Sequence, residues 1–193
     1  MVQLTRIYTK GGDKGKTSLG SGKRLSKSSV RITAIGEFDE ANAVIGVARC
    51  FAEGEVDDLL FRIQNDLFDV GADLCMPLEG EPQEVLRIIP SQVSFLEEKI
   101  DFFNKTLSSL TSFVLPAGSS LSAALHQARA VVRRAERAIC ALNEMEQVNP
   151  IIIHYMNRLS DLLFVLSRYD NHQHSGDILW VPGAYRGEAG EVP

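Results

Sequence analysis

The chain has only three cysteines, and they form no pattern typical of a disulfide framework or a structural zinc site. Cys50, Cys75 and Cys140 are widely spaced and include no CxxC pair, so we expect free thiols in a reducing compartment. Apolar runs are short, because none approaches the roughly 20 residues of a membrane-spanning helix. The first residues lack the apolar stretch of a signal peptide. These absences predict a cytoplasmic protein without a membrane partner, or a mitochondrial matrix protein if the chain is a processed eukaryotic one.

Motifs of nucleophilic and metal-dependent catalysis are missing as well. The sequence has no GxSxG motif and no arrangement of cysteine and histidine that would pair a nucleophile with a base. His172 and His174 form an HxH motif, but no carboxylate or cysteine stands at metal-ligand spacing. We therefore predict a solvated tail there and no metal-ligating residues. His126 and His154 are expected to be structural.

The net charge argues against a nucleic-acid partner, and the positive charge is concentrated in one segment. Hydrophobic residues make up 45% and charged residues 23% of the 193 residues, which is ordinary for one globular domain with a sizeable core. The net charge is −5, so we expect no nucleic-acid partner. Positive charge is nevertheless concentrated between residues 9 and 28, where six lysines and arginines oppose only Asp13.

The most informative segment is residues 9–18, which read TKGGDKGKTS. Glycines let backbone N–H groups approach a ligand closely, and lysines and hydroxyls supply charge and hydrogen bonds for a polyphosphate. Residues 10–17 resemble the P-loop pattern GxxxxGK[ST], but position 10 is lysine, and Gly20 and Gly22 argue against the helix that must follow a P-loop. We predict a phosphate-binding loop of another kind; a flexible basic arm is the alternative.

Beyond this loop, apolar residues recur at spacings of three and four, which is typical of amphipathic helices. Proline and serine residues indicate where the later helices start. A segment rich in proline and glutamate, Pro77 to Pro82, is expected to be mobile. Only the first eight residues and residues 178–181 look extended. The pattern predicts helices over 36–53 and 57–75, from Pro90 to Phe103, over about 120–145, and from Pro150 to about 170.

The expected fold is therefore all-α: a five-helix antiparallel bundle with an N-terminal glycine-rich phosphate-binding loop. We interpret residues 1–193 as a single domain. It comprises an N-terminal nucleotide-binding loop (1–28), the helical bundle (30–171) and a C-terminal tail (172–193).

The fourth predicted helix carries several arginines on one face. Arg129, Arg133, Glu136 and Arg137 follow steps of four, three and one, so they line one stripe. Three arginines on one stripe repel each other, so an anion or several carboxylates must lie opposite them. The alternative is a solvated face or a set of interhelical ion pairs.

Polar residues also interrupt the neighbouring apolar stretches. Asn157 and Asp161 stand four apart on the fifth helix, where such residues cost stability unless they have partners. Asp39 and Glu40 are expected to open the first helix. An amide, carboxylates and guanidinium groups are suited to a nucleotide's base and ribose, while the N-terminal loop holds its phosphates.

Six blocks then occur in order: IYTKGGDKG at 7–15, FDE at 38–40, FVLPAG at 113–118, RRAER at 133–137, YMNRLSDLLF at 155–164 and GDILW at 176–180. Together they resemble the PduO-type ATP:cob(I)alamin adenosyltransferases over nearly the entire chain. The resemblance implies a homotrimer of five-helix bundles with ATP bound between adjacent subunits.

The resemblance also implies roles for individual residues. Asp39 and Arg129 match a pair that bridges subunits near the corrinoid, and Phe113 matches the residue that fills the space below the corrin ring. The expected catalytic residues are Arg133, Phe113, Asp39 and Arg129. The expected ATP-binding residues are Thr9, Lys10, Gly11, Gly12, Thr17, Ser18, Lys27, Arg133, Arg134, Glu136, Arg137 and Asn157.

The implied reaction explains why the sequence needs no nucleophilic side chain. Cob(I)alamin attacks the 5′ carbon of ATP and expels triphosphate, which forms the cobalt–carbon bond of adenosylcobalamin. Because Co(I) is a strong nucleophile, the enzyme must only position the reactants and stabilise the leaving triphosphate, with Mg²⁺ assisting. The expected partners are ATP and the corrinoid, with a cobalamin reductase and an adenosylcobalamin-dependent enzyme as candidate protein partners.

Two other readings remain. A nucleotide-binding regulator or corrinoid chaperone would keep the ATP site without turnover; the presence of Phe113, Asp39 and Arg129 favours the enzyme. A ferritin-like metal bundle would need Glu-x-x-His pairs on facing helices, and the sequence has none.

Overall fold

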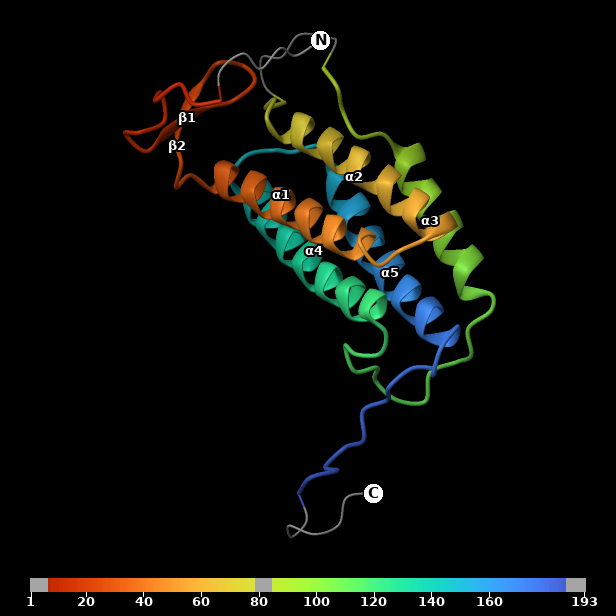
Figure 1. The fold of residues 1–193 in the computed structure, drawn as a ribbon. Helices are drawn as coiled ribbons and strands as arrows, with labels where there is room; N and C mark the ends of the chain where they lie inside the picture. The colour runs from red at the N-terminus through yellow and green to blue at the C-terminus, as the bar shows by residue number, and fades with distance from the viewer. Residues whose placement is uncertain (1–6, 79–84, 187–193) are drawn as a thin grey trace.

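The structure, a computed structural model, describes residues 7–78 and 85–186. Figure 1 shows its helices side by side in a bundle, with a short hairpin at one end and the C-terminal segment at the other. The predicted all-α, five-helix bundle is confirmed. The elements are β1 (Lys16–Ser18), β2 (Arg24–Ser26), α1 (Val30–Arg49), α2 (Gly54–Leu74), α3 (Pro90–Asn104), α4 (Ser120–Met145) and α5 (Pro150–His172).

Helix α4 is central to the packing, because it lies against α1 on one side and α5 on the other. Ala128 and Ala135 are fully buried and small enough to let the neighbouring helices approach closely. Leu125, Ile139 and Leu142 are also fully buried and fill the core around them. The remaining face of α4 is left for its arginines.

The starts of α4 and α5 are fixed by side-chain caps. Ser119 Oγ accepts a hydrogen bond from the Ser122 N–H at 2.9 Å, which is the bond that an N-cap serine makes. Asn149 Oδ1 accepts from the Ile151 N–H at 3.1 Å, and Pro150 occupies the first helical position. Only residues 146–149 lie between α4 and α5, and such a short connection makes the two helices antiparallel neighbours.

The first helix starts earlier than expected. It begins at Val30 rather than near residue 36, so Asp39 and Glu40 lie in its middle and do not open it. The helix continues through Gly36 because its first turn is held by a contact with the end of α2. Arg31 is buried, and its Nη1 donates to the Leu74 carbonyl at 2.7 Å. Tertiary packing thus overrides the local cost of a glycine.

The β1–β2 hairpin was not foreseen, since only the first eight residues and residues 178–181 were expected to be extended. Its strands pair antiparallel, with Thr17 opposite Leu25. Ile7 and Tyr8, the described part of the first eight residues, form no strand. Leu179 does pair with Val114, in an isolated β-bridge.

Most of the segment from Pro77 to Pro82, which was expected to be mobile, lies outside the described residues.

Within the described ranges, no helix has the combination of length and apolar character that crossing a bilayer demands.

Candidate functional site

The N-terminal glycine-rich loop folds back onto the β-hairpin. Lys10 has a φ of 59° and Gly15 a φ of 72°, a region that non-glycine residues rarely adopt. Arg24 holds the loop, since its Nη2 donates to the Gly11 carbonyl at 2.7 Å and its Nη1 to Ser18 Oγ at 3.3 Å. In the sequence, Arg24 is only one of the positive charges between residues 9 and 28, and its positioning role becomes visible only in the hairpin.

Lys27 lies directly over one of the loop glycines. A Cβ placed on Gly12 would meet Lys27 Nζ at 3.0 Å, so a larger residue there would displace the ammonium group. A Cβ on Gly11 would lie 3.6 Å from Thr9 Oγ1. The fold therefore brings together four of the predicted phosphate-binding residues, Thr9, Gly11, Gly12 and Lys27.

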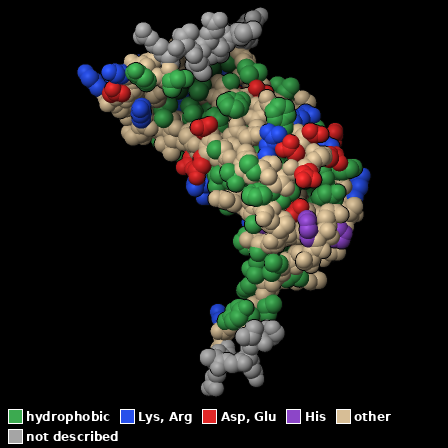
Figure 2. Space-filling view, in the orientation of Figure 1, with side chains coloured by type: hydrophobic (Ala, Val, Ile, Leu, Met, Phe, Trp, Pro, Cys, Tyr) green, Lys and Arg blue, Asp and Glu red, His purple; other side chains and the backbone are tan. Residues whose placement is uncertain are grey.

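The hairpin presents its positive charge to solvent while anchored at its turn. Figure 2 shows lysine and arginine side chains gathered over this end of the molecule. Leu19 is buried, and the Gly20 N–H donates to the Cys75 carbonyl, at the end of α2, at 3.2 Å. This combination of exposed cations and an anchored backbone is suited to a mobile anion such as a triphosphate.

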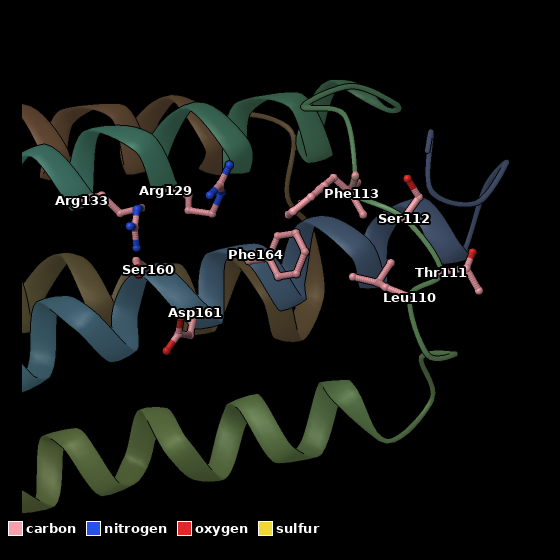
Figure 3. A pocket seen from close by; sticks show the side chains of 10 residues that line it. Leu110, Thr111, Ser112, Phe113, Arg129, Arg133, Ser160, Asp161 and Phe164 are labelled. Atoms are coloured by element: carbon pink, nitrogen blue, oxygen red, sulfur yellow. The ribbon is translucent and has the colours of Figure 1, made fainter. Parts of the chain in front are cut away.

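A second group of predicted residues lines a pocket of about 520 Å³ between α4, α5 and the loop that precedes α4. Figure 3 shows Arg129 and Arg133 on α4 facing residues of α5, with Phe113 projecting from the loop toward the same space. The lining residues are Leu110, Thr111, Ser112, Phe113, Val114, Arg129, Arg133, Ser160, Asp161 and Phe164.

Positive charge exceeds negative charge in the pocket lining, where two arginines stand against the single carboxylate of Asp161. Arg129 and Arg133 form no ion pair with any residue in the described ranges. Arg129 is half-buried, its Nε has no hydrogen-bond partner there, and its guanidinium carbon lies 5.8 Å from the centre of the Phe164 ring. Burial and then the neighbouring charge of Arg133 lower the pKa of Arg129. Such a pair of cations favours an anionic ligand.

The next turn of α4 meets α5 through polar contacts. Asn157 Nδ2 donates to Glu136 Oε1 at 3.0 Å, and Arg158 Nη1 donates to Asn157 Oδ1 at 2.6 Å. Arg137 Nη1 donates to the carbonyl of Arg133 at 3.0 Å. The predicted nucleotide contacts Glu136 and Asn157 are therefore adjacent, and the amide of Asn157 has a defined orientation.

Arg134 lies on a different side of α4 from the pocket. Its guanidinium group is paired with Glu37 at 2.5 Å and with Glu40, both on α1. These pairs raise the pKa of Arg134, with the Glu37 hydrogen bond as the largest cause. Contact between Arg134 and ATP, as predicted, would require these ion pairs to open.

Asp39 and Arg129 are not brought together within one chain. Asp39 is exposed on α1 and forms no ion pair with another described residue. Its neighbour Glu40 reaches Arg134, more than one turn of α4 beyond Arg129. A contact between Asp39 and Arg129 would therefore have to come from a second copy of the chain.

Phe113 is the most exposed aromatic residue of the pocket, with 77% of its surface accessible. Sequence reasoning alone would place a phenylalanine before Val114 and Leu115 in the core. The structure leaves the ring largely exposed instead, so it contributes little to the core. It is available to contact a ligand.

The loop residues and the pocket lie at opposite ends of the bundle. The hairpin precedes α1 and contacts the end of α2, whereas the Phe113 loop leads into the start of α4 (Figure 1). A single chain therefore separates the predicted phosphate-binding residues from the predicted corrinoid residues.

A sequence profile of the family described as cobalamin adenosyltransferase matches residues 7–170. The chain belongs to this family. It is 49% identical over 190 residues to the corrinoid adenosyltransferase of Mycobacterium tuberculosis (strain ATCC 25618 / H37Rv), covering 96% of this chain and 97% of that relative. It is 39% identical over 179 residues to the corrinoid adenosyltransferase of Bacillus subtilis (strain 168), covering 90% and 91%.

Solved structures of the family have the same fold. A PduO-type ATP:corrinoid adenosyltransferase from Lactobacillus reuteri, with a phenylalanine replaced by histidine and complexed with cobalamin and ATP, matches with a TM-score of 0.87 at 36% identity, covering 92% of this chain and 97% of that one. An arginine-to-lysine variant complexed with ATP matches with a TM-score of 0.85 at 36% identity, covering 91% and 100%.

His126 lies behind the pocket wall without a hydrogen-bond partner. It is buried, neither ring nitrogen has a partner among the described residues, and its ring packs edge-on against Phe164 with centroids 6.1 Å apart. Burial and then the charge of Arg129 lower the pKa of His126, and Asp177 opposes them. His126 is thus held neutral in the folded protein.

Acidification should therefore destabilise the fold through His126. The unfolded chain takes up a proton as the pH falls below the ordinary histidine value of 6.5, whereas the folded chain does so only at lower pH, so stability present above 6.5 is lost below it. Urea unfolding at about pH 7.5 and about pH 5.5 should show a smaller loss for His126→Gln than for the wild type.

The exposed His154 supplies the control, since His154→Gln should keep the wild-type loss. An equal loss in the wild type and in His126→Gln would contradict the assignment.

Proposed function

We propose that this chain transfers the 5′-deoxyadenosyl group of ATP to the cobalt of cob(I)alamin, forming adenosylcobalamin and releasing triphosphate. Membership of the adenosyltransferase family supports the reaction. The observation that carries it to this chain's own residues is the pocket that combines an exposed phenylalanine with two arginines that pair with no acid in the described ranges. An anion site and an apolar surface, side by side, suit a reaction between a polyphosphate and a corrin ring.

We infer that the complete site forms between adjacent subunits of a homotrimer. The N-terminal loop of one subunit would supply Thr9, Lys10, Gly11, Gly12, Thr17, Ser18 and Lys27 to the triphosphate. Helices α4 and α5 of the next subunit would supply Arg133 from the pocket and Glu136, Arg137 and Asn157 from beside it. The separation of these two groups within one chain supports this arrangement, as does the absence of a partner for Asp39 among the described residues. In a closed ring of identical, head-to-tail contacts, the N-terminal loop of each subunit would meet the pocket of the next.

The protein's contribution to the reaction is positioning and electrostatics. Co(I) supplies the electron pair that forms the new Co–C5′ bond, and the C5′–O bond breaks with its electrons going to the triphosphate. Negative charge therefore grows on the leaving group as the bond breaks. Arg133, with lysine side chains of the loop, would stabilise that charge more in the transition state than in bound ATP.

The Mg²⁺ ion expected with ATP fits the chemistry of the loop only as a phosphate-bound ion. Among the described residues, no group of three or more His, Cys, Asp or Glu side chains converges as a metal site. Mg²⁺ commonly binds through substrate phosphates and retains several waters. The ion would therefore arrive with ATP, near the hydroxyls of Thr17 and Ser18, and neutralise phosphate charge.

Phe113 would act on the cobalt rather than on ATP. Reduction of Co(II) is difficult while an axial base donates to the metal, and an apolar ring in the position of that base favours its release. The 77% exposure of Phe113 supports this role, because the side chain gains little by burial in the free protein.

The proposed reaction is tested by anaerobic incubation with chemically reduced cobalamin and Mg·ATP, following the absorption spectrum of the Co–C product. Arg133→Ala should slow turnover strongly, because it removes ~2–4 kcal/mol of transition-state stabilisation, and it should leave the fold intact. Arg62→Ala is the control, because this arginine lies over the Phe95 ring on another face of the bundle.

A wild-type rate for Arg133→Ala would remove Arg133 from the site. A wild-type protein that binds ATP and cobalamin without forming product would overturn the enzymatic function in favour of a regulator or chaperone.

Phe113→Ala distinguishes displacement of the base from simple packing. Because the ring is largely exposed, its loss should cost far less than the ~3–5 kcal/mol of a buried phenylalanine. The ternary complex with ATP should show less four-coordinate Co(II) than the wild type. Turnover should fall strongly when Co(II) must be reduced in place, and much less when Co(I) is supplied. An unchanged cobalt spectrum would refute the role.

A further inference from the structure

The loop that carries Phe113 has no regular structure of its own. Residues 105–119 connect α3 to α4, and within them the described backbone hydrogen bonds beyond the ends of the helices are few. An exposed ring on such a loop has no core contacts that would fix its direction. The position of Phe113 must therefore come from contacts made by its backbone and its immediate neighbours.

Those contacts are made by the segment 177–180, which follows α5. The Leu115 N–H donates to the Ile178 carbonyl at 2.8 Å, and the Trp180 N–H donates to the Phe113 carbonyl at 2.8 Å. Ser112 Oγ also donates to the Trp180 carbonyl at 2.6 Å. The segment is thus paired with the Phe113 loop as a short antiparallel ladder around the Val114–Leu179 bridge.

This register places Trp180 opposite Phe113. Their ring centroids are 6.0 Å apart, with an interplanar angle of 55°, which is within the range of favourable aromatic pairs. Cross-strand aromatic pairs also stabilise the pairing of the strands that carry them. Trp180 therefore contacts both the backbone and the side chain of Phe113.

A buried arginine ties both partners of the ladder to α5. Arg168 Nε donates to Asp177 Oδ2 at 2.8 Å, and Arg168 Nη2 donates to the Ser108 carbonyl at 2.8 Å. The Arg168 and Asp177 side chains are only 8% and 15% exposed. One guanidinium group thus fixes the start of the 177–180 segment and the start of the Phe113 loop to the same helix.

We propose that the 177–180 segment is a strap that positions Phe113 for its contact with the corrinoid, with Trp180 and Asp177 as the positioning residues. Trp180 holds the backbone and ring of Phe113, and Asp177 anchors the strap through Arg168. The proposal rests on the proposed function of Phe113. It adds that residues outside the reacting groups determine whether Phe113 reaches the position of the axial base.

The first experiment compares Trp180→Ala with Trp180→Phe in the full-length protein. Trp180→Ala should lower the four-coordinate Co(II) fraction in the presence of ATP and slow the Co(II)-dependent reaction by about tenfold or more, since small misplacements are costly. Adenosylation from preformed Co(I) and the affinity for ATP should change little. Trp180→Phe should restore the cobalt spectrum, because the aromatic pair is retained.

Tyr185→Ala is the matched control. Tyr185 is an aromatic residue of the same C-terminal segment, 86% exposed, and it lies beyond the paired residues. Its removal should leave both reactions at the wild-type level. A Trp180→Ala protein with the wild-type Co(II) spectrum, or one that loses the Co(I) and Co(II) reactions equally, would overturn the proposal.

A second measurement follows the strap without cobalamin. Trp180 is the only tryptophan in the chain, so its fluorescence reports on the strap alone. Asp177→Asn should shift the emission to the red and increase quenching by iodide, as the strap detaches; unchanged emission and quenching would count against the anchor.

The cobalt spectra and the tryptophan fluorescence test the role of Phe113 and the existence of the strap separately. If Phe113→Ala itself leaves the Co(II) spectrum unchanged, the proposed function of Phe113 fails. The existence of the strap is then decided by the fluorescence of Asp177→Asn, and its role in cobalt coordination is refuted.

Discussion

The antiparallel packing of α4 against α5 is the constraint on which the rest of the site depends. Buried alanines on α4 allow the two helices to lie close together, and the short capped connection at Asn149 and Pro150 fixes their alignment. Arg129 and Arg133 consequently face Ser160, Asp161 and Phe164 across one pocket. Arg129 and Arg133 have no ion-pair partner in the part of the chain that the structure describes, and they repel each other, so the packing energy of the core maintains a pocket that a bound anion would stabilise.

The same packing separates the two halves of the predicted site. Helix α4 runs from the Phe113 loop at one end of the bundle toward the end that carries the β-hairpin (Figure 1). A helix of its length keeps these ends apart by tens of ångströms. Flexibility of the loop does not close that distance, because Leu19 and Gly20 anchor the hairpin beside Cys75. In the proposed homotrimer, a second copy of the chain would supply the missing half without any rearrangement.

The sequence predicted the helices well because their signals are local. Apolar spacing, a serine before α4 and Pro150 at the start of α5 all act within a few residues, and the helices that they predict are confirmed. The start of α1 was misjudged because Arg31 is held by Leu74 and Glu146, which are distant in sequence. The hairpin was missed because its strands are three residues long and rich in polar side chains.

The site shows the same limit of local reasoning. Periodicity put Arg129 and Arg133 on one face, but it could not tell that Arg134, one residue on, pairs with Glu37 and Glu40 instead. Nor could it link Trp180 to Phe113, since that contact joins segments separated by two helices and depends on the Arg168 anchor. Long-range contacts of this kind leave no periodic signal in the sequence.

The central claim, that one subunit's loop completes the next subunit's pocket, is tested most directly with mixed trimers. Lys27→Ala in the loop and Arg133→Ala in the pocket would be co-expressed with different tags and purified through both. In each mixed ring, one interface in three joins an intact loop to an intact pocket, so activity should recover to about one third of the wild-type value. Mixed assemblies no more active than the two parent variants would contradict the account.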